Sequence, residues 1–100
     1  MKEPADSRIL AEIWEVIGER VQNPRPDSYT TRLLTDEKGI DKVLEKLGEE
    51  TTEFILAVKN GVNERTVEEA ADLLFHLLVA LRAAGLELSD VMQELGHRKK

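Results

Sequence analysis

Apolar residues recur at helical spacing along the chain, and clusters of turn residues separate the periodic stretches. The first predicted helix runs from about Asp6, a good N-cap, to about Val21. The segment 23–26, Asn-Pro-Arg-Pro, stops it. Ser28 then caps a short turn that extends through Leu34.

Two longer helices are predicted at the centre of the fold. The first runs from about Asp36 to Asn60 with Gly61 as its C-cap. Its apolar stripe consists of Ile40, Val43, Leu44, Leu47, Phe54 and Val58. Asn63 caps the second, which ends at Gly85. Because apolar residues surround this second helix almost completely, we expect it to be the central helix, buried on most sides.

A final helix is predicted from Ser89, its cap, to near Gly96, with Val91, Met92 and Leu95 on its apolar side. Short connections between long helices favour antiparallel neighbours. The sequence contains no repeat and no linker long enough to divide it. We therefore predict one all-α domain over residues 1–100, an antiparallel bundle of four main helices.

Length, composition and charge limit the kinds of protein that this chain can be. A chain of 100 residues with 41% hydrophobic content can build one core. A domain of this size buries only about two thirds of its unfolded surface, so a homodimer or larger homo-oligomer is expected to complete the bundle. A net charge of -6 argues against nucleic-acid binding, since basic residues gather only in the short 98–100 tail. The sequence shows no signal peptide and no apolar run that could span a membrane, so we expect a cytoplasmic protein without membrane contact.

Acidic residues gather along the edges of two apolar stripes. At about 100° per residue from Leu47, Glu50 lies about 60° away, Glu53 about 120° and Glu49 about 160°, all on one flank. On the next long helix, Glu69, His76 and Asp72 lie about 40°, 60° and 100° from Leu73, again on one flank. Antiparallel packing of the two helices would bring Glu50 and Glu53 near Glu69 and Asp72.

Clustered carboxylates at the border of an apolar core need cations. The chain has no cysteine, and oxygen ligands alone favour a hard divalent ion, Mg²⁺ or Mn²⁺. Such an ion shares its shell with substrate phosphates and makes a bound water more acidic. Asp72 supports this hypothesis most strongly, because an aspartate next to Leu73-Leu74-Phe75 is costly to bury unless it is paired or bound to a metal.

Simpler interpretations stand beside these predictions. Glu49 and Lys46 have the spacing of an ordinary helical salt bridge, and His76 is as consistent with a core histidine bonded to Asp72 as with a metal or phosphate contact. Lys42 and Lys46 are likewise consistent with two solvated lysines beside glutamates. The acids as a whole could be a solvated face of a non-catalytic helical interaction module.

The run Glu49-Glu50-Thr51-Thr52-Glu53, followed by Glu69-Ala70-Ala71-Asp72, resembles the EExxE and ExxD signature of the all-α nucleotide pyrophosphohydrolase (MazG-like) superfamily. Three further segments resemble its phosphoribosyl-ATP pyrophosphohydrolase branch: residues 28–30, residues 42–50 and residues 71–77. The similarity extends over about residues 9 to 98.

This resemblance implies Mg²⁺-dependent hydrolysis of phosphoribosyl-ATP to phosphoribosyl-AMP and pyrophosphate, the second step of histidine biosynthesis. It implies metal-binding and catalytic roles for Glu49, Glu50, Glu53, Glu69 and Asp72, one of which would activate the attacking water. The candidates for substrate contacts are Ser28, Tyr29, Thr30, Lys42, Lys46 and His76. The alternative from the same superfamily is a housecleaning enzyme that hydrolyses non-canonical nucleoside triphosphates.

Two positions depart from the family pattern. Thr51 stands where a small residue often follows the Glu-Glu pair, and Phe75 replaces the tyrosine that often precedes the histidine. Both departures leave the acids intact. Some relatives carry a fused cyclohydrolase domain, and this chain is expected to be the stand-alone form.

Overall fold

The computed structural model describes residues 8–99 and has five helices and no strand over that range. They are α1 (Arg8–Gln22), α2 (Tyr29–Leu34), α3 (Ile40–Asn60), α4 (Asn63–Ala83) and α5 (Leu88–Arg98). The predicted all-α class is confirmed. Asp6, the predicted N-cap of the first helix, lies outside the described residues.

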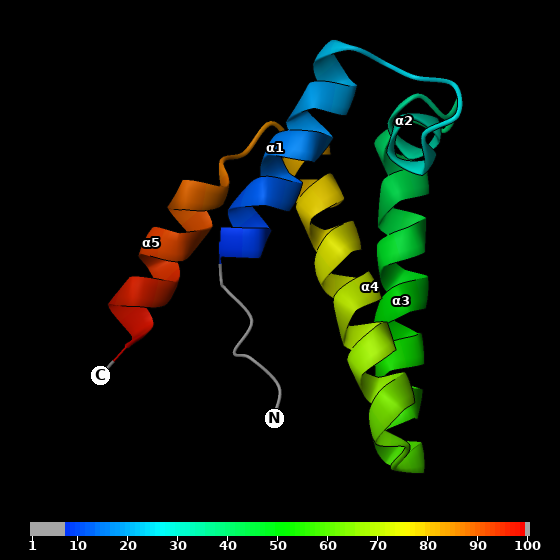
Figure 1. Ribbon diagram of the computed structural model, residues 1–100, viewed down its shortest axis with the longest axis vertical. Coiled ribbons are helices and arrows are strands. Elements are labelled where there is room, and N and C mark those ends of the chain that lie inside the picture. Colours follow the sequence, from blue (N-terminus) through cyan, green and yellow to red (C-terminus); the bar gives the residue numbers. More distant parts are fainter. Residues whose placement is uncertain (1–7, 100) are drawn as a thin grey trace.

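The two longest helices, α3 and α4, form a hairpin in which they run antiparallel (Figure 1). Gly61 ends α3 in the left-handed region at φ 73°, and its N–H reaches the carbonyls of Ala57 and Val58. A side chain would strain this conformation, which explains why a glycine joins the two helices. The predicted C-cap at Gly61 is confirmed, and so is the predicted cap at Ser28, whose hydroxyl accepts from the N–H of Thr31.

The predicted start of α3 at Asp36 is wrong, because the helix begins at Ile40. Asp36 instead accepts a hydrogen bond from the N–H of Lys38 at 2.9 Å, and Gly39 has φ 63°. Aspartate side chains compete for nearby backbone donors in this way and favour turns. Residues 36–39 therefore form a turn ahead of the helix.

Two residues predicted as N-caps lie inside the helices that they were expected to precede. Asn63 is already the first residue of α4 and Val62 occupies the cap position in an extended conformation. Similarly, Ser89 lies inside α5, and Glu87 precedes the helix. Neither cap residue makes a side-chain hydrogen bond to its helix. The end of α5 lies two residues beyond the predicted Gly96.

The core lies at one end of the hairpin. There α1 and α2 pack against the second half of α4 and the first half of α3 (Figure 1). The buried residues of this core are Trp14, Ile17, Leu33, Val43, Leu78, Val79 and Ala80. At the other end of the hairpin, no further helix of the described chain packs against α3 and α4.

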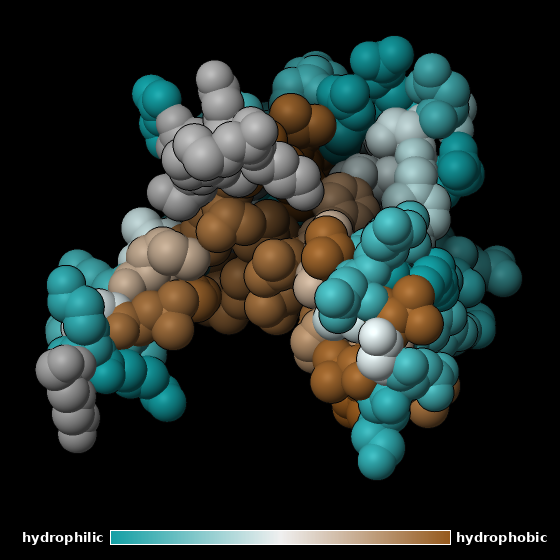
Figure 2. Space-filling model, turned by 60° about the horizontal axis from the view of Figure 1, so that its bottom comes forward, coloured by the Kyte–Doolittle hydropathy of each residue, from teal (hydrophilic) through white to brown (hydrophobic). Residues whose placement is uncertain are grey.

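The prediction that the α4 helix is buried on most sides is wrong within a single chain. Val67, Leu74 and Leu77 are 69%, 48% and 40% exposed. The reason is that α1 and α2 cover only one end of α4 and that α5 diverges from the bundle with no buried residue of its own (Figure 1). Figure 2 shows the resulting apolar surface, hollowed between α5 and the hairpin. None of the helices within residues 8–99 has an apolar stretch that could cross a membrane.

Candidate metal centre

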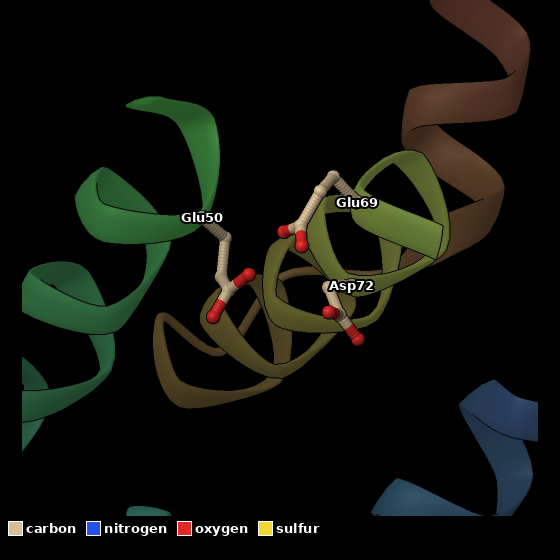
Figure 3. A group of neighbouring side chains, drawn as sticks. All are labelled: Glu50, Glu69 and Asp72. Carbon is tan, nitrogen blue, oxygen red and sulfur yellow. The ribbon is translucent and has the colours of Figure 1, made fainter. Parts of the chain in front are cut away.

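Two helices bring three acids together in the middle of the hairpin. Glu50 extends from α3, and Glu69 and Asp72 extend from the facing half of α4 (Figure 3). One carboxylate oxygen of each lies within 4.8 Å of the other two. Glu50 and Glu69 are 8% and 3% exposed, whereas Asp72 is exposed to solvent. The group thus lies where the dry interface between the helices opens.

The other two predicted acids have different surroundings. Glu53 lies on α3, near enough to Glu69 for its carboxyl group to raise the pKa of Glu69. Glu49 instead pairs with Lys46, with 3.0 Å between carboxylate and ammonium, and its side chain is half exposed. The helical salt bridge that the sequence allowed for Glu49 is therefore present, and Glu53 lies beside the cluster but is not one of the three acids whose oxygens converge.

The cluster is electrostatically strained without a cation. Burial raises the pKa of Glu50, and the neighbouring Glu53 carboxylate raises it further. Burial also raises the pKa of Glu69, with the neighbouring Glu53 carboxyl group as the next cause. Within residues 8–99, no hydrogen-bond partner reaches the buried Oε2 atoms of Glu50 and Glu69. Two buried acceptors that face each other across a helix pair are well suited to a bound cation.

Arg65 is a member of the site that the sequence analysis missed. Its guanidinium lies 2.7 Å from Oε1 of Glu69, and 3.3 Å from the exposed Glu68. The spacing of four residues between Arg65 and Glu69 on one helix was the available signal. Arg65 also lines a cleft beside Glu53, where Leu56, Ala57, Asn60 and Val62 form the other walls.

A hydrogen-bonded chain connects α2 to the cluster. The hydroxyl of Tyr29 lies 2.9 Å from Nε2 of His76, and Nδ1 of His76 lies 2.7 Å from the backbone carbonyl of Asp72. His76 is buried, and the rings of Tyr29 and Phe75 both pack against it. The bond that the sequence suggested between His76 and Asp72 is present, but it uses the carbonyl of Asp72 rather than its carboxylate.

The remaining candidates for substrate contacts are paired or buried within the protein. Ser28 caps α2, and Thr30 is buried at the start of the same helix. The ammonium groups of Lys42 and Lys46 lie 3.8 Å and 3.0 Å from the carboxylates that follow them by one turn. Both lysines are partly exposed, so their contact with substrate phosphates stays a prediction.

Comparison with known proteins gives one consistent family. The family described as phosphoribosyl-ATP pyrophosphohydrolase matches residues 10–99. A phosphoribosyl-ATP pyrophosphatase of Methanoregula boonei is 68% identical over 99% of this chain and 95% of its own length. Proteins of the same name from Methanoculleus marisnigri and Methanosphaerula palustris are 61% and 58% identical, each over 95% of this chain and 98% and 96% of their own lengths.

Proposed function

The chain belongs to the phosphoribosyl-ATP pyrophosphohydrolase family, and we propose that it hydrolyses phosphoribosyl-ATP to phosphoribosyl-AMP and pyrophosphate, the second step of histidine biosynthesis. The observation that carries this proposal is the convergence of Glu50, Glu69 and Asp72 from two helices, with two buried oxygens left unpaired. A solvated acidic face has no reason to bury two carboxylate oxygens without partners.

The donor set fits a hard divalent ion. In the octahedral shell of Mg²⁺, ligands about 2.1 Å from the metal are about 3.0 Å apart at neighbouring positions and about 4.2 Å apart at opposite positions. The three oxygens, within 4.8 Å of one another, would reach these spacings if their side chains rotated toward a shared ion. We therefore propose that Glu50, Glu69 and Asp72 hold Mg²⁺, or Mn²⁺ with the same ligands. The bound ion would neutralise phosphate charge and lower the pKa of a coordinated water.

Glu53 is the acid best situated to hold the attacking water. Its carboxyl group lies against Glu69 but, unlike Glu69, is exposed to solvent at the mouth of the adjoining cleft. A carboxylate beside the ligands rather than among them can orient a water and accept its proton. Glu49 is less suited to this role because Lys46 holds it at 3.0 Å.

The lysines of α3 supply positive charge on the side of the cluster that faces α2. Lys46 is near enough to Tyr29 and Glu50 for both to raise the pKa of its ammonium, after the larger effect of Glu49. A triphosphate bound at the metal would meet this ammonium and that of Lys42, one turn away. We propose that both lysines exchange their carboxylate partners for phosphate oxygens when the substrate binds.

A second copy of the chain is the proposed partner. Figure 2 shows one broad apolar surface to which α5 contributes, and Leu74, Leu77, Met92 and Leu95 are all at least 40% exposed. A monomeric protein rarely leaves a contiguous surface of this kind uncovered. Pairing through α4 and α5 would cover it and give α4 the central position that its sequence predicts.

The decisive experiment measures pyrophosphate release from phosphoribosyl-ATP beside ordinary and modified nucleoside triphosphates, with Mg²⁺ and with EDTA. We expect selective release from phosphoribosyl-ATP that EDTA abolishes. Asp72→Asn should lower kcat/KM at least about 100-fold, whereas Asp90→Asn on α5 should not. Release from the triphosphates alone would indicate the housecleaning alternative, and no release from any substrate would refute a catalytic role.

A further inference from the structure

A cleft adjoins the acidic cluster on the side of the turn that joins α3 and α4. The residues that line it are Glu53, Leu56, Ala57, Asn60, Val62 and Arg65. Two of them connect it to the cluster: Glu53 follows Glu50 by one helical turn, and Arg65 lies 2.7 Å from Oε1 of Glu69. A ligand held at the proposed metal site can therefore extend into this cleft.

The spacing of residues along α3 makes the two sites continuous. Glu50, Glu53, Ala57 and Asn60 follow one another at intervals of three, four and three residues, which keeps them on one face of the helix. At 1.5 Å per residue, Asn60 lies about 10 Å beyond Glu53. A nucleotide whose phosphates bind at the metal would extend its ribose and then its base along this face.

The cleft suits a base better than a phosphate. Its volume of about 220 Å³ is below the range of about 300 to 1,000 Å³ for pockets that enclose a whole ligand, so it accommodates one part of a nucleotide. Its one cation, Arg65, is already paired with Glu69, which leaves little positive charge for a phosphate. The side chains of Leu56, Ala57 and Val62 supply apolar walls for the flat faces of a purine.

Asn60 is the polar side chain of the cleft that matches an adenine. It is exposed, so a ligand can reach it, and its amide carries both a donor and an acceptor. Adenine presents the complementary pair on one edge, where the N6 group donates and N7 accepts. Asparagine pairs with this edge through two hydrogen bonds.

We propose that this cleft is the adenine subsite of the enzyme, in which the amide of Asn60 donates a hydrogen bond to N7 and accepts one from N6. Asn60 is then a specificity-determining residue. The inference rests on the proposed function, because it takes the phosphates to lie at the metal and at Lys46. Lys46 precedes Glu50 by one turn of α3, whereas the cleft begins one turn after Glu50, so phosphates and base bind on opposite sides of the cluster.

The test compares phosphoribosyl-ATP with its 7-deaza counterpart, in which a C–H group replaces N7, for wild type and Asn60→Leu. Wild type should prefer the substrate with N7 by about tenfold in kcat/KM, as expected for a hydrogen bond to a base edge. Leucine has a similar size but cannot hydrogen-bond, so Asn60→Leu should bring this ratio to about one. A ratio of about one in wild type, or an undiminished ratio in Asn60→Leu, would overturn the proposal.

Two further variants sharpen the test. The carboxylate of Asn60→Asp keeps the shape of the amide but can only accept, so this variant should also lose the preference for N7, and it replaces Asn60→Leu if that variant does not fold. Asn63→Leu is the matched control, because Asn63 is an exposed asparagine beside Glu64 and Val67, on another part of the surface. It should keep the wild-type ratio, and a ratio of about one in this control would contradict the assignment to Asn60.

Wild-type activity on phosphoribosyl-ATP separates the two claims. Its absence would refute the proposed function. Its presence without any preference for N7 would refute only the adenine subsite.

Discussion

The guanidinium of Arg65 lies 2.7 Å from Oε1 of Glu69, one helical turn further along α4. This ion pair occupies one oxygen of the carboxylate and leaves Oε2, which is buried without a hydrogen-bond partner, for the proposed metal ion. Partners of this kind hold a ligand in the orientation that the metal needs. Arg65 is thus expected to matter for metal affinity although it touches no ion itself.

Replacing Arg65 by Gln should raise the Mg²⁺ concentration for half-maximal activity by about 10-fold to 100-fold. Titration of pyrophosphate release with Mg²⁺ measures this shift. Glu68→Gln is the matched control, because it removes the exposed partner of Arg65 and leaves the pair with Glu69. Identical Mg²⁺ curves for Arg65→Gln and wild type would show that Glu69 needs no such support.

Glu53→Gln distinguishes water activation from metal binding. Glutamine retains the shape of the side chain but cannot take up a proton, so kcat should fall by about 100-fold or more. The Mg²⁺ concentration for half-maximal activity should change much less. Asp41→Asn, in the exposed first turn of α3, serves as the control. A large loss of Mg²⁺ affinity at nearly normal kcat would instead make Glu53 a metal ligand.

Acidification should stabilise the metal-free protein. The pKa values of Glu50 and Glu69 are raised above the ordinary value of 4.5, in each case chiefly by burial. The folded state therefore binds these protons more readily than the unfolded state, and stability rises as the pH falls through the folded pKa toward 4.5. Thermal melts in EDTA should show a higher melting temperature at about pH 5 than at about pH 7.

Mg²⁺ should oppose this dependence of the melting temperature on pH. At about pH 7 it neutralises the ionised cluster and should raise the melting temperature, and at about pH 5 it competes with protons and should raise it less. Glu45 does not interfere, because Lys38 lowers its pKa and the stability it contributes is lost only below 4.5. A melting temperature that does not respond to millimolar Mg²⁺ at either pH would argue against a preformed metal site.

The sequence predicted those parts of the site that depend on periodicity. Helical spacing placed Glu50 and Glu53 on one flank of α3, and Glu69 and Asp72 on one flank of α4, and a tight turn at Gly61 made the two flanks face each other. These are local properties of two adjacent helices, so no long-range information was needed. The clustering of Glu50, Glu69 and Asp72 in the structure agrees with that prediction.

Features that depend on three-dimensional packing were not predictable in the same way. The pair of Tyr29 and His76 joins residues 47 positions apart, and its distance depends on how α2 lies across the hairpin. Similarly, α5 points away from the helical bundle because of the turn near Gly85, at φ 76°. The amphipathic pattern of α5 itself does not predict this direction. Helix starts at Asn63 and Ser89 failed because suitable cap residues can also be the first residues of a helix.

The apolar surface of α4 and α5 gives a prediction for the assembly. Leu74→Glu should convert the proposed homo-oligomer into a monomer, since a charge would be buried at the interface without a partner. Size-exclusion chromatography with light scattering measures the mass. Val21→Glu is the matched control, because Val21 is 48% exposed and belongs to the last turn of α1, which lies apart from α5 (Figure 1). A monomeric wild type would contradict the proposed assembly directly.

Gly18 leaves room for an interaction that holds α1 on α4. The guanidinium of Arg82 lies 4.0 Å from the centre of the Trp14 ring and donates to the Trp14 carbonyl at 2.9 Å. A Cβ at Gly18 would lie 2.5 Å from the same guanidinium, so alanine there would displace it. Gly48 is also helical but has open space around its missing Cβ.

Gly18→Ala and Gly48→Ala should therefore differ in stability. Both gain about 1 kcal/mol in helix propensity, but only the first loses the cation–π contact and the hydrogen bond, which together contribute about 1 to 2 kcal/mol. Chemical denaturation should accordingly show Gly48→Ala to be the more stable variant by about that difference. Equal stability would mean that Arg82 finds an equivalent position, and that the glycine is not needed for the packing of α1 on α4.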